Sequence, residues 1–234
     1  MAEISSNTTT KVLVGEHYDM ARTIVSKYPN SRSAVLPLLF LVQGIEGHVT
    51  DRGMRDVGVL LGLTPAEVLA SGSFYTMLKK RPTGEYLISV CRNVACAHRG
   101  AYNVVNALSE RLDVDPGGVS DDGKFELETA ECLATCDGAP SMQINYEDFY
   151  DVTPQSAIDL VDRIQRGESV SSVRGEVVKT HREVSYETAV AGARLPGTAG
   201  DHEARTVGGE WPPEDMKVGD RPKLDGREGG SHGG

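Results

Sequence analysis

The chain has 234 residues, a formal net charge of −10 and 25% charged side chains, so it is long enough for one large domain or two small ones. An acidic chain lacks the basic stripe that marks nucleic-acid-binding surfaces, which excludes that class of partner. The acidic excess is uneven: residues 85–167 carry 6 basic and 15 acidic side chains, residues 1–84 carry 9 and 7, and residues 168–234 carry 9 and 12.

Targeting and membrane signals are not evident. Residues 1–6 contain neither the basic region nor the apolar region of a signal peptide. The longest apolar run, residues 34–42, contains a proline and is too short to span a bilayer. We therefore expect a soluble cytoplasmic protein with no direct membrane insertion.

Helical periodicity dominates the first third of the chain, where apolar side chains recur at spacings of three and four positions. Thr64 and Glu67 have the spacing of a capping box, which is a strong helix start. Pro65 suits the first helical position. We expect helices over residues 17–28, 33–43 and 65–71 within a small helical bundle domain at residues 16–84, preceded by a flexible N-terminus at residues 1–15.

From residue 85 the apolar period changes from helix to strand. In chain order, the pattern predicts a strand at residues 86–90, a helix at 101–112, a strand at 125–131, a hairpin over 141–152 and a helix at 154–164. A helix between two strands implies a right-handed crossover, so the first two strands should be parallel. Residues 85–167 are thus predicted to form an α/β domain.

All four cysteines of the chain fall in two close pairs, Cys91 with Cys96 and Cys132 with Cys136. Paired cysteines can form disulfides, a structural zinc site or an iron–sulfur ligand set. Disulfides belong to oxidising compartments, and structural zinc usually takes C-x2-C spacings. The C-x4-C opening is that of plant-type 2Fe–2S ferredoxins and favours iron, while zinc and thiol chemistry stay open.

The predicted topology brings the two pairs together. The first pair begins where the first strand ends, and the second pair begins where the second strand ends. Open α/β sheets place their sites at the carboxyl edge of parallel strands. Two loops separated by 35 residues can therefore supply four thiolates to one point.

Four stretches resemble the E subunit of bacterial NADH:quinone oxidoreductase, respiratory complex I. The stretch from Cys91 to Ala101 resembles the first cluster motif of that family, and the agreement continues at residues 122–125, 131–136 with Ala139-Pro140, and 73–77. The similarity covers about residues 16–166. One departure is Asp137, because family members commonly have a glycine after the last ligand.

This resemblance implies a fold, a cofactor and a partner. It implies a thioredoxin-like 2Fe–2S domain behind the helical domain, with one cluster held by the cofactor-binding and metal-binding residues Cys91, Cys96, Cys132 and Cys136. It also implies an FMN- and NADH-binding flavoprotein subunit and other peripheral-arm subunits as partners. The protein would then be an electron-transfer subunit, peripheral to the cytoplasmic face of the membrane.

No catalytic residue is predicted in this chain. It contains no G-x-G-x-x-G after a strand and no P-loop, so the hydride chemistry of NADH and FMN would belong to the partner. Two alternatives remain: an equivalent cluster subunit of an NAD-linked hydrogenase or formate dehydrogenase, and a non-redox module with structural zinc. His98 suggests a Rieske interpretation, but no second histidine lies near the other cysteine pair, so we expect a side chain that faces solvent or lies behind the ligands.

Residues 168–234 differ in composition from the rest of the chain. They contain 12 glycines and 4 prolines and have almost no periodic apolar pattern. Such a segment cannot offset its own ordering entropy, so we expect it to be extended or disordered. Trp211 is the exception, as a candidate anchor on a neighbouring subunit.

Overall fold

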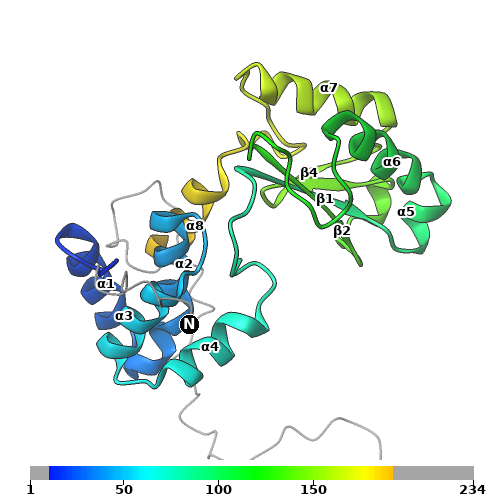
Figure 1. Cartoon of the computed structure of the whole chain (residues 1–234). Coiled ribbons are helices and arrows are strands. Elements are labelled where there is room, and N and C mark those ends of the chain that lie inside the picture. The colour runs from blue at the N-terminus through cyan, green and yellow to red at the C-terminus, as the bar shows by residue number, and fades with distance from the viewer. Residues whose placement is uncertain (1–10, 192–234) are drawn as a thin grey trace, which may run out of the picture. The chain divides into compact units, whose positions relative to one another are not determined.

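The computed structural model describes residues 11–191, and Figure 1 shows their helices and strands in chain order. The predicted Trp211 anchor lies outside these residues. The first elements are all helical: α1 Glu16–Ser26, the 3-10 helix η1 Ser31–Ala34, α2 Val35–Glu46, α3 Asp51–Leu61 and α4 Pro65–Phe74.

The starts of these helices follow from their capping residues. The Thr64 hydroxyl accepts a hydrogen bond from the Glu67 N–H at 3.3 Å, and the Glu67 carboxylate accepts one from the Thr64 N–H at 2.9 Å. This is the predicted capping box, which satisfies two N–H groups that the helix itself leaves unpaired. Thr50 caps α3 in a similar way by accepting from the Gly53 N–H at 3.1 Å.

Helix α8, His181–Ala191, corrects the prediction for the C-terminal segment. The expectation of an extended or disordered chain from residue 168 is wrong for this stretch. Gly44 of α2 packs so closely on Tyr186 of α8 that a Cβ there would lie 2.9 Å from Tyr186 Cβ. The buried Gln43 side chain also donates a hydrogen bond to Ser185 Oγ at 3.0 Å. The helix is stabilised by a surface of α2 that lies far away in sequence, which periodicity within the segment could not reveal.

The second set of elements is a sheet with its helices: β1 Tyr86–Cys91, α5 Val94–His98, α6 Ala101–Leu112, β2 Phe125–Ala130, the 3-10 helix η2 Cys136–Gly138, β3 Met142–Ile144, β4 Glu147–Phe149 and α7 Pro154–Gln165. The strand order is β2-β1-β3-β4. Strands β1 and β2 are parallel, with Cys91 opposite Ala130, so the predicted pairing is confirmed. The other two pairs of neighbouring strands are antiparallel.

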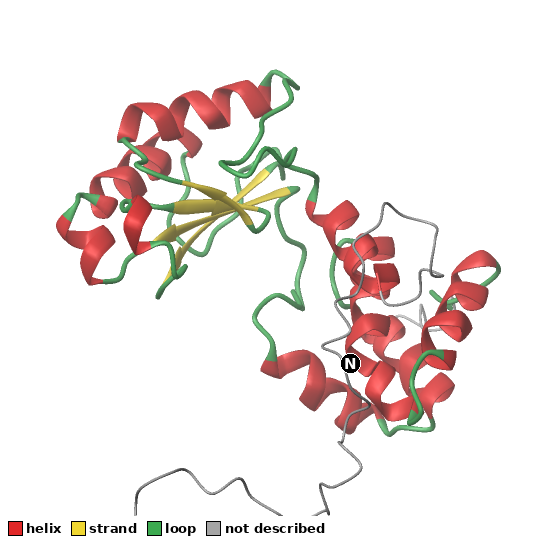
Figure 2. Ribbon diagram, turned by 180° about the vertical axis from the view of Figure 1, so that it is seen from behind, coloured by secondary structure: helices red, strands yellow, loops and turns green. Residues whose placement is uncertain are grey.

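One face of the sheet carries the apolar core with α6 and α7, which Figure 2 shows on the same side of the strands. This core includes Ile88, Leu127 and Met142, each of which is fully buried. The opposite face is polar, and there Lys79 forms ion pairs with Glu126 at 3.2 Å and Glu128 at 3.3 Å. The apolar core of the sheet therefore lies on the face that α6 and α7 cover.

The helices are short relative to the thickness of a membrane. Among residues 11–191, no single helix is both long enough and apolar enough to cross one. Only the pair α3 and α4, bent by 117° at its break, passes by length and composition.

Candidate metal centre

Cys91 and Cys96 form the buried half of the site. Cys91 is the last residue of β1, and its N–H donates a hydrogen bond to the Ser141 carbonyl at 3.1 Å. Cys96 lies in α5, a one-turn helix whose start is capped by the Asn93 side chain, which accepts from the Val94 N–H at 2.6 Å. The two residues are only 3% and 1% exposed, so the sheet edge and α5 hold both thiols away from water.

Cys132 and Cys136 form the exposed half. Cys132 follows the end of β2, whose last residue lies opposite Cys91 in the parallel ladder. The loop then passes through Ala134, which has a positive φ of 58° and donates its N–H to Cys132 Sγ at 3.4 Å. Cys136 opens η2. The backbone of the loop therefore turns sharply between the two thiols and points an N–H at the first of them.

The other three cysteines influence the Cys136 thiol. The pKa of the exposed Cys136 thiol is raised, first by partial removal from water and then by the charges of Cys132, Cys96 and Cys91. The two cysteine loops start at the same edge of the sheet, since Cys91 lies opposite Ala130. Within residues 11–191, no three His, Cys, Asp or Glu side chains lie close enough together to hold a single metal ion.

The donor set nevertheless fits a 2Fe–2S cluster. Such a cluster takes four thiolates, shared between its two iron atoms. Here the two loops that carry the four cysteines leave the same carboxyl edge of adjacent parallel strands, with two thiols buried and two exposed. Once deprotonated, the four cysteine sulfurs are the kind of ligand that iron–sulfur clusters require.

Two buried hydroxyl groups lie next to Cys96. The Thr135 hydroxyl donates to Ser141 Oγ at 2.7 Å, and Ser141 Oγ lies 3.5 Å from Cys96 Sγ. Sequence reasoning missed both residues. The sequence signals that could have found them are a hydroxyl residue directly before the last cysteine, Thr135, and a second one at the entry to β3, Ser141.

The charged residues beside the cysteines are mostly paired. Arg92 forms an ion pair with Glu131, so the two opposite charges that flank the first and third cysteines largely neutralise each other. Arg99 donates to the Ala139 carbonyl and lies 3.7 Å from Asp151. Asp137 is exposed and has no ion pair within the described residues. The unpaired charge that remains beside the cysteines is therefore the Asp137 carboxylate. His98 is exposed and faces solvent, as expected.

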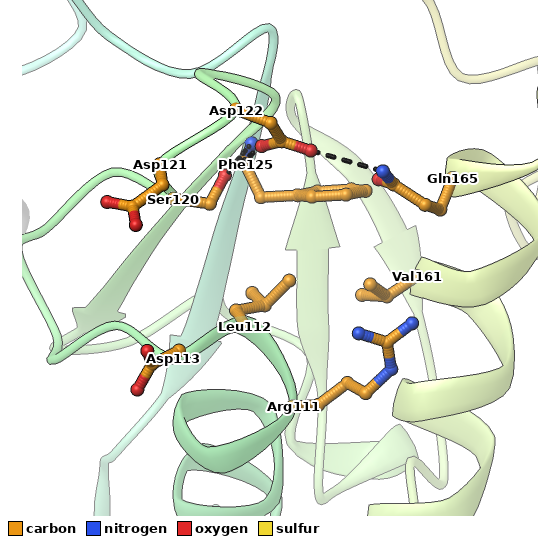
Figure 3. A pocket seen from close by; sticks show the side chains of 9 residues that line it. All are labelled: Arg111, Leu112, Asp113, Ser120, Asp121, Asp122, Phe125, Val161 and Gln165. Atoms are coloured by element: carbon orange, nitrogen blue, oxygen red, sulfur yellow. Dashed lines mark hydrogen bonds between the residues drawn. The ribbon is translucent and has the colours of Figure 1, made fainter.

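A separate cavity of about 320 Å³ lies between the C-terminal end of α6, the start of β2 and α7, at the opposite end of the parallel strands (Figure 3). Several of its polar groups already have partners. Arg111 pairs with Asp162, and Asp122 accepts hydrogen bonds from Ser120 at 2.6 Å and from Gln165 at 3.1 Å. These contacts within the described chain occupy Arg111, Asp122 and Gln165, which would otherwise be available to a ligand.

Comparison with known proteins gives a consistent result. The sequence model described as "Thioredoxin-like [2Fe-2S] ferredoxin" matches residues 21–165. The E subunit of the NADH-quinone oxidoreductase of Mycobacterium tuberculosis (strain ATCC 25618 / H37Rv) is 44% identical over 165 residues, which cover 70% of this chain and 66% of the relative. Subunit 2 of the Thermus thermophilus enzyme is 34% identical over 60% of this chain and 79% of its own length.

Two further similarities bear on the fold and on related chains. The E 2 subunit of the NADH-quinone oxidoreductase of Rhizobium meliloti (strain 1021) is 32% identical over 63% of this chain and 88% of its own length. Among solved structures, an NAD+-reducing [NiFe]-hydrogenase in the H2-reduced state aligns with a TM-score of 0.51 and 22% identity, covering 57% of this chain and 22% of that chain. At that identity, the structural likeness concerns the fold alone.

Proposed function

The chain belongs to the thioredoxin-like 2Fe–2S ferredoxin family and is similar to the E subunit of NADH-quinone oxidoreductases, and from this premise we propose that it is an electron-transfer subunit of such an enzyme. Its cluster would be held by Cys91, Cys96, Cys132 and Cys136. The observation that supports the proposal is that both cysteine-bearing loops begin at the same end of the paired parallel strands β1 and β2.

The chain's own residues suit one-electron transfer. A bound 2Fe–2S cluster supplies a single site that takes up one electron and releases it. The burial of Cys91 and Cys96 keeps water from one half of the site, and the exposure of Cys132 and Cys136 leaves the other half at the surface. A redox partner can therefore approach the Cys132–Cys136 loop without any rearrangement of the sheet.

The partner follows from what the sequence lacks. The sequence contains no nucleotide-binding fingerprint, so it reveals no means by which this chain would bind NADH or transfer its hydride. We assign the binding of NADH and FMN to a flavoprotein subunit that exchanges electrons with this chain. The assembly would be the peripheral arm of a membrane complex on its cytoplasmic face, with quinone as the final acceptor.

Metal analysis of the purified full chain tests the cluster. We expect two irons and two acid-labile sulfides per chain, visible absorption, and a paramagnetic signal after reduction. Single cysteine-to-serine variants should lower iron content, whereas Ser109→Ala, a half-buried hydroxyl change on α6 away from the site, should not. A colourless protein with stoichiometric zinc and no iron would overturn the proposal.

Reconstitution tests the partner. The chain is mixed anaerobically with a flavoprotein subunit of an NADH-quinone oxidoreductase, and NADH is added. We expect the visible absorption of the cluster to bleach only when the flavoprotein is present. Bleaching by NADH alone would place the nucleotide site on this chain, and no bleaching with an active flavoprotein would contradict the proposed pairing.

A further inference from the structure

We propose that Ser141 is a positioning residue that raises the reduction potential of the site by donating a hydrogen bond to the Cys96 thiolate, with Thr135 fixing the direction of that bond. The inference deepens the proposed function and rests on Cys96 being a cluster ligand.

The three side chains form a short, buried line. Thr135 Oγ1 donates to Ser141 Oγ at 2.7 Å, and Ser141 Oγ lies 3.5 Å from Cys96 Sγ. Ser141 and Cys96 are each 1% exposed, and Thr135 is 8% exposed. Because water does not reach this line, no solvent molecule can substitute for the serine hydroxyl as a donor.

The backbone holds Ser141 in place from both sides. Its carbonyl accepts a hydrogen bond from the N–H of Cys91 at 3.1 Å, and the next residue, Met142, begins β3 opposite Val90 of β1. Ser141 is therefore fixed to the strand that ends in one cysteine while its hydroxyl lies beside another. Its position is set by the sheet and does not depend on a mobile loop.

The direction of the second bond follows from counting protons. A hydroxyl group has one proton to donate and lone pairs to accept with. Ser141 Oγ already accepts from Thr135, so its own proton remains available. A metal-bound thiolate carries no proton and can only accept. Within residues 11–191, Ser141 Oγ has no other partner. The serine must therefore donate to Cys96 Sγ.

Such a bond favours the reduced state. Reduction adds negative charge to the cluster and its sulfur ligands, and a hydrogen bond to sulfur stabilises that charge. Bonds to ionised acceptors are about twice as strong as neutral ones. Without the serine hydroxyl, we expect the ratio of reduced to oxidised protein at a given potential to fall on the order of tenfold, or about 59 mV for one electron.

The experiment is redox titration of the holoprotein, followed by its paramagnetic signal. Ser141→Ala should have a midpoint potential lower by about 59 mV, which corresponds to a tenfold fall in the ratio of reduced to oxidised protein. Thr135→Val should have a smaller decrease, because Ser141 keeps its hydroxyl but loses the partner that orients it. Ser109→Ala is the matched control and should leave the midpoint unchanged. Iron–sulfur stretching frequencies should shift in deuterated buffer for the parent and shift less for Ser141→Ala.

The outcomes distinguish a failure of the proposed function from a failure of this inference. A parent protein without iron defeats the proposed function. If the parent holds a cluster but the variants have an unchanged or higher midpoint potential, only the proposed role of Ser141 is overturned. If Ser141→Ala does not retain a cluster, Thr135→Val alone decides, because it keeps the serine: an unchanged midpoint would overturn the proposed hydroxyl line.

Discussion

The ring of Tyr150 packs directly on Gly138, two residues after the last cysteine. A Cβ at position 138 would lie 2.3 Å from Tyr150 Cγ, closer than non-bonded carbon atoms approach. The same segment is held by a hydrogen bond from the Asp151 N–H to the Gly138 carbonyl at 2.8 Å. The loop that carries Cys136 is thus seated against the strand-end segment after β4, and only glycine permits this contact.

Gly138→Ala should therefore displace the Cys136 loop. Overpacking of this kind costs roughly 1–3 kcal/mol of unfolding free energy, and the iron content per chain should fall with it. The measurements are iron analysis and urea unfolding. Asp137→Ala, at the neighbouring exposed position, is the control and should retain iron. If Gly138→Ala kept its full iron content and the stability of the parent, the Tyr150 ring would have moved aside and the prediction would be wrong.

Asp137 should lower the reduction potential of a bound cluster. Its exposed carboxylate is adjacent to Cys136, and a negative charge there disfavours an added electron. Asp137→Asn keeps the shape of the side chain and removes the charge, so the midpoint should rise in a redox titration. Glu16→Gln on α1 removes the same charge elsewhere and should not change it. An unchanged or lower midpoint for Asp137→Asn contradicts the hypothesis.

Gly44→Ala should destabilise the packing of α8 on α2. The added Cβ would lie 2.9 Å from both Cβ and the backbone nitrogen of Tyr186, and backbone cannot move aside as a side-chain tip can. We expect a loss of roughly 1–3 kcal/mol in urea unfolding.

Gly72→Ala is the matched control for that change. Gly72 also lies inside a helix, α4, but its nearest neighbour would be 3.5 Å away, an ordinary contact. This substitution should be neutral or stabilising by up to about 1 kcal/mol, because glycine is unfavourable inside helices. Equal stability of the two variants would refute the close approach of α2 and α8.

His181 should make the fold sensitive to acid. The side chain is 1% exposed and neither ring nitrogen has a hydrogen-bond partner among the described residues. Burial, reinforced by the charge of Lys79 and opposed by Glu126, lowers the pKa of His181 from 6.5 to about 4. Between these values the unfolded chain binds the proton and the folded chain does not. The contribution of His181 to stability is therefore fully present above pH 6.5 and should fall by about 3 kcal/mol as the pH drops to 4.

The test is the pH dependence of the free energy of unfolding. His181→Leu removes the titrating group and leaves no buried polar atom unpaired, so its stability should fall less between pH 7 and pH 4 than that of the parent. His98→Gln changes an exposed histidine and should follow the parent. Parallel curves for the parent and His181→Leu would argue against a buried neutral imidazole.

Local sequence determined much of this protein. Capping by Thr64 and Glu67, the apolar period of α6 and the apolar run of β1 depend on neighbours within one or two turns or along one strand, so they could be predicted. The crossover rule then predicted the parallel pairing that starts both cysteine loops at the same edge of the sheet.

Tertiary structure alone decided the rest, because the deciding contacts join residues far apart in the chain. Helix α8 forms on a surface supplied by Gly44, more than a hundred positions earlier. The need for glycine at position 138 comes from Tyr150 after a later strand, and the hydroxyl beside Cys96 comes from Ser141 at the entry to β3. The spacing of the cysteines indicated a metal site, but only the packing of the sheet edge set which thiols are buried and which polar groups contact them.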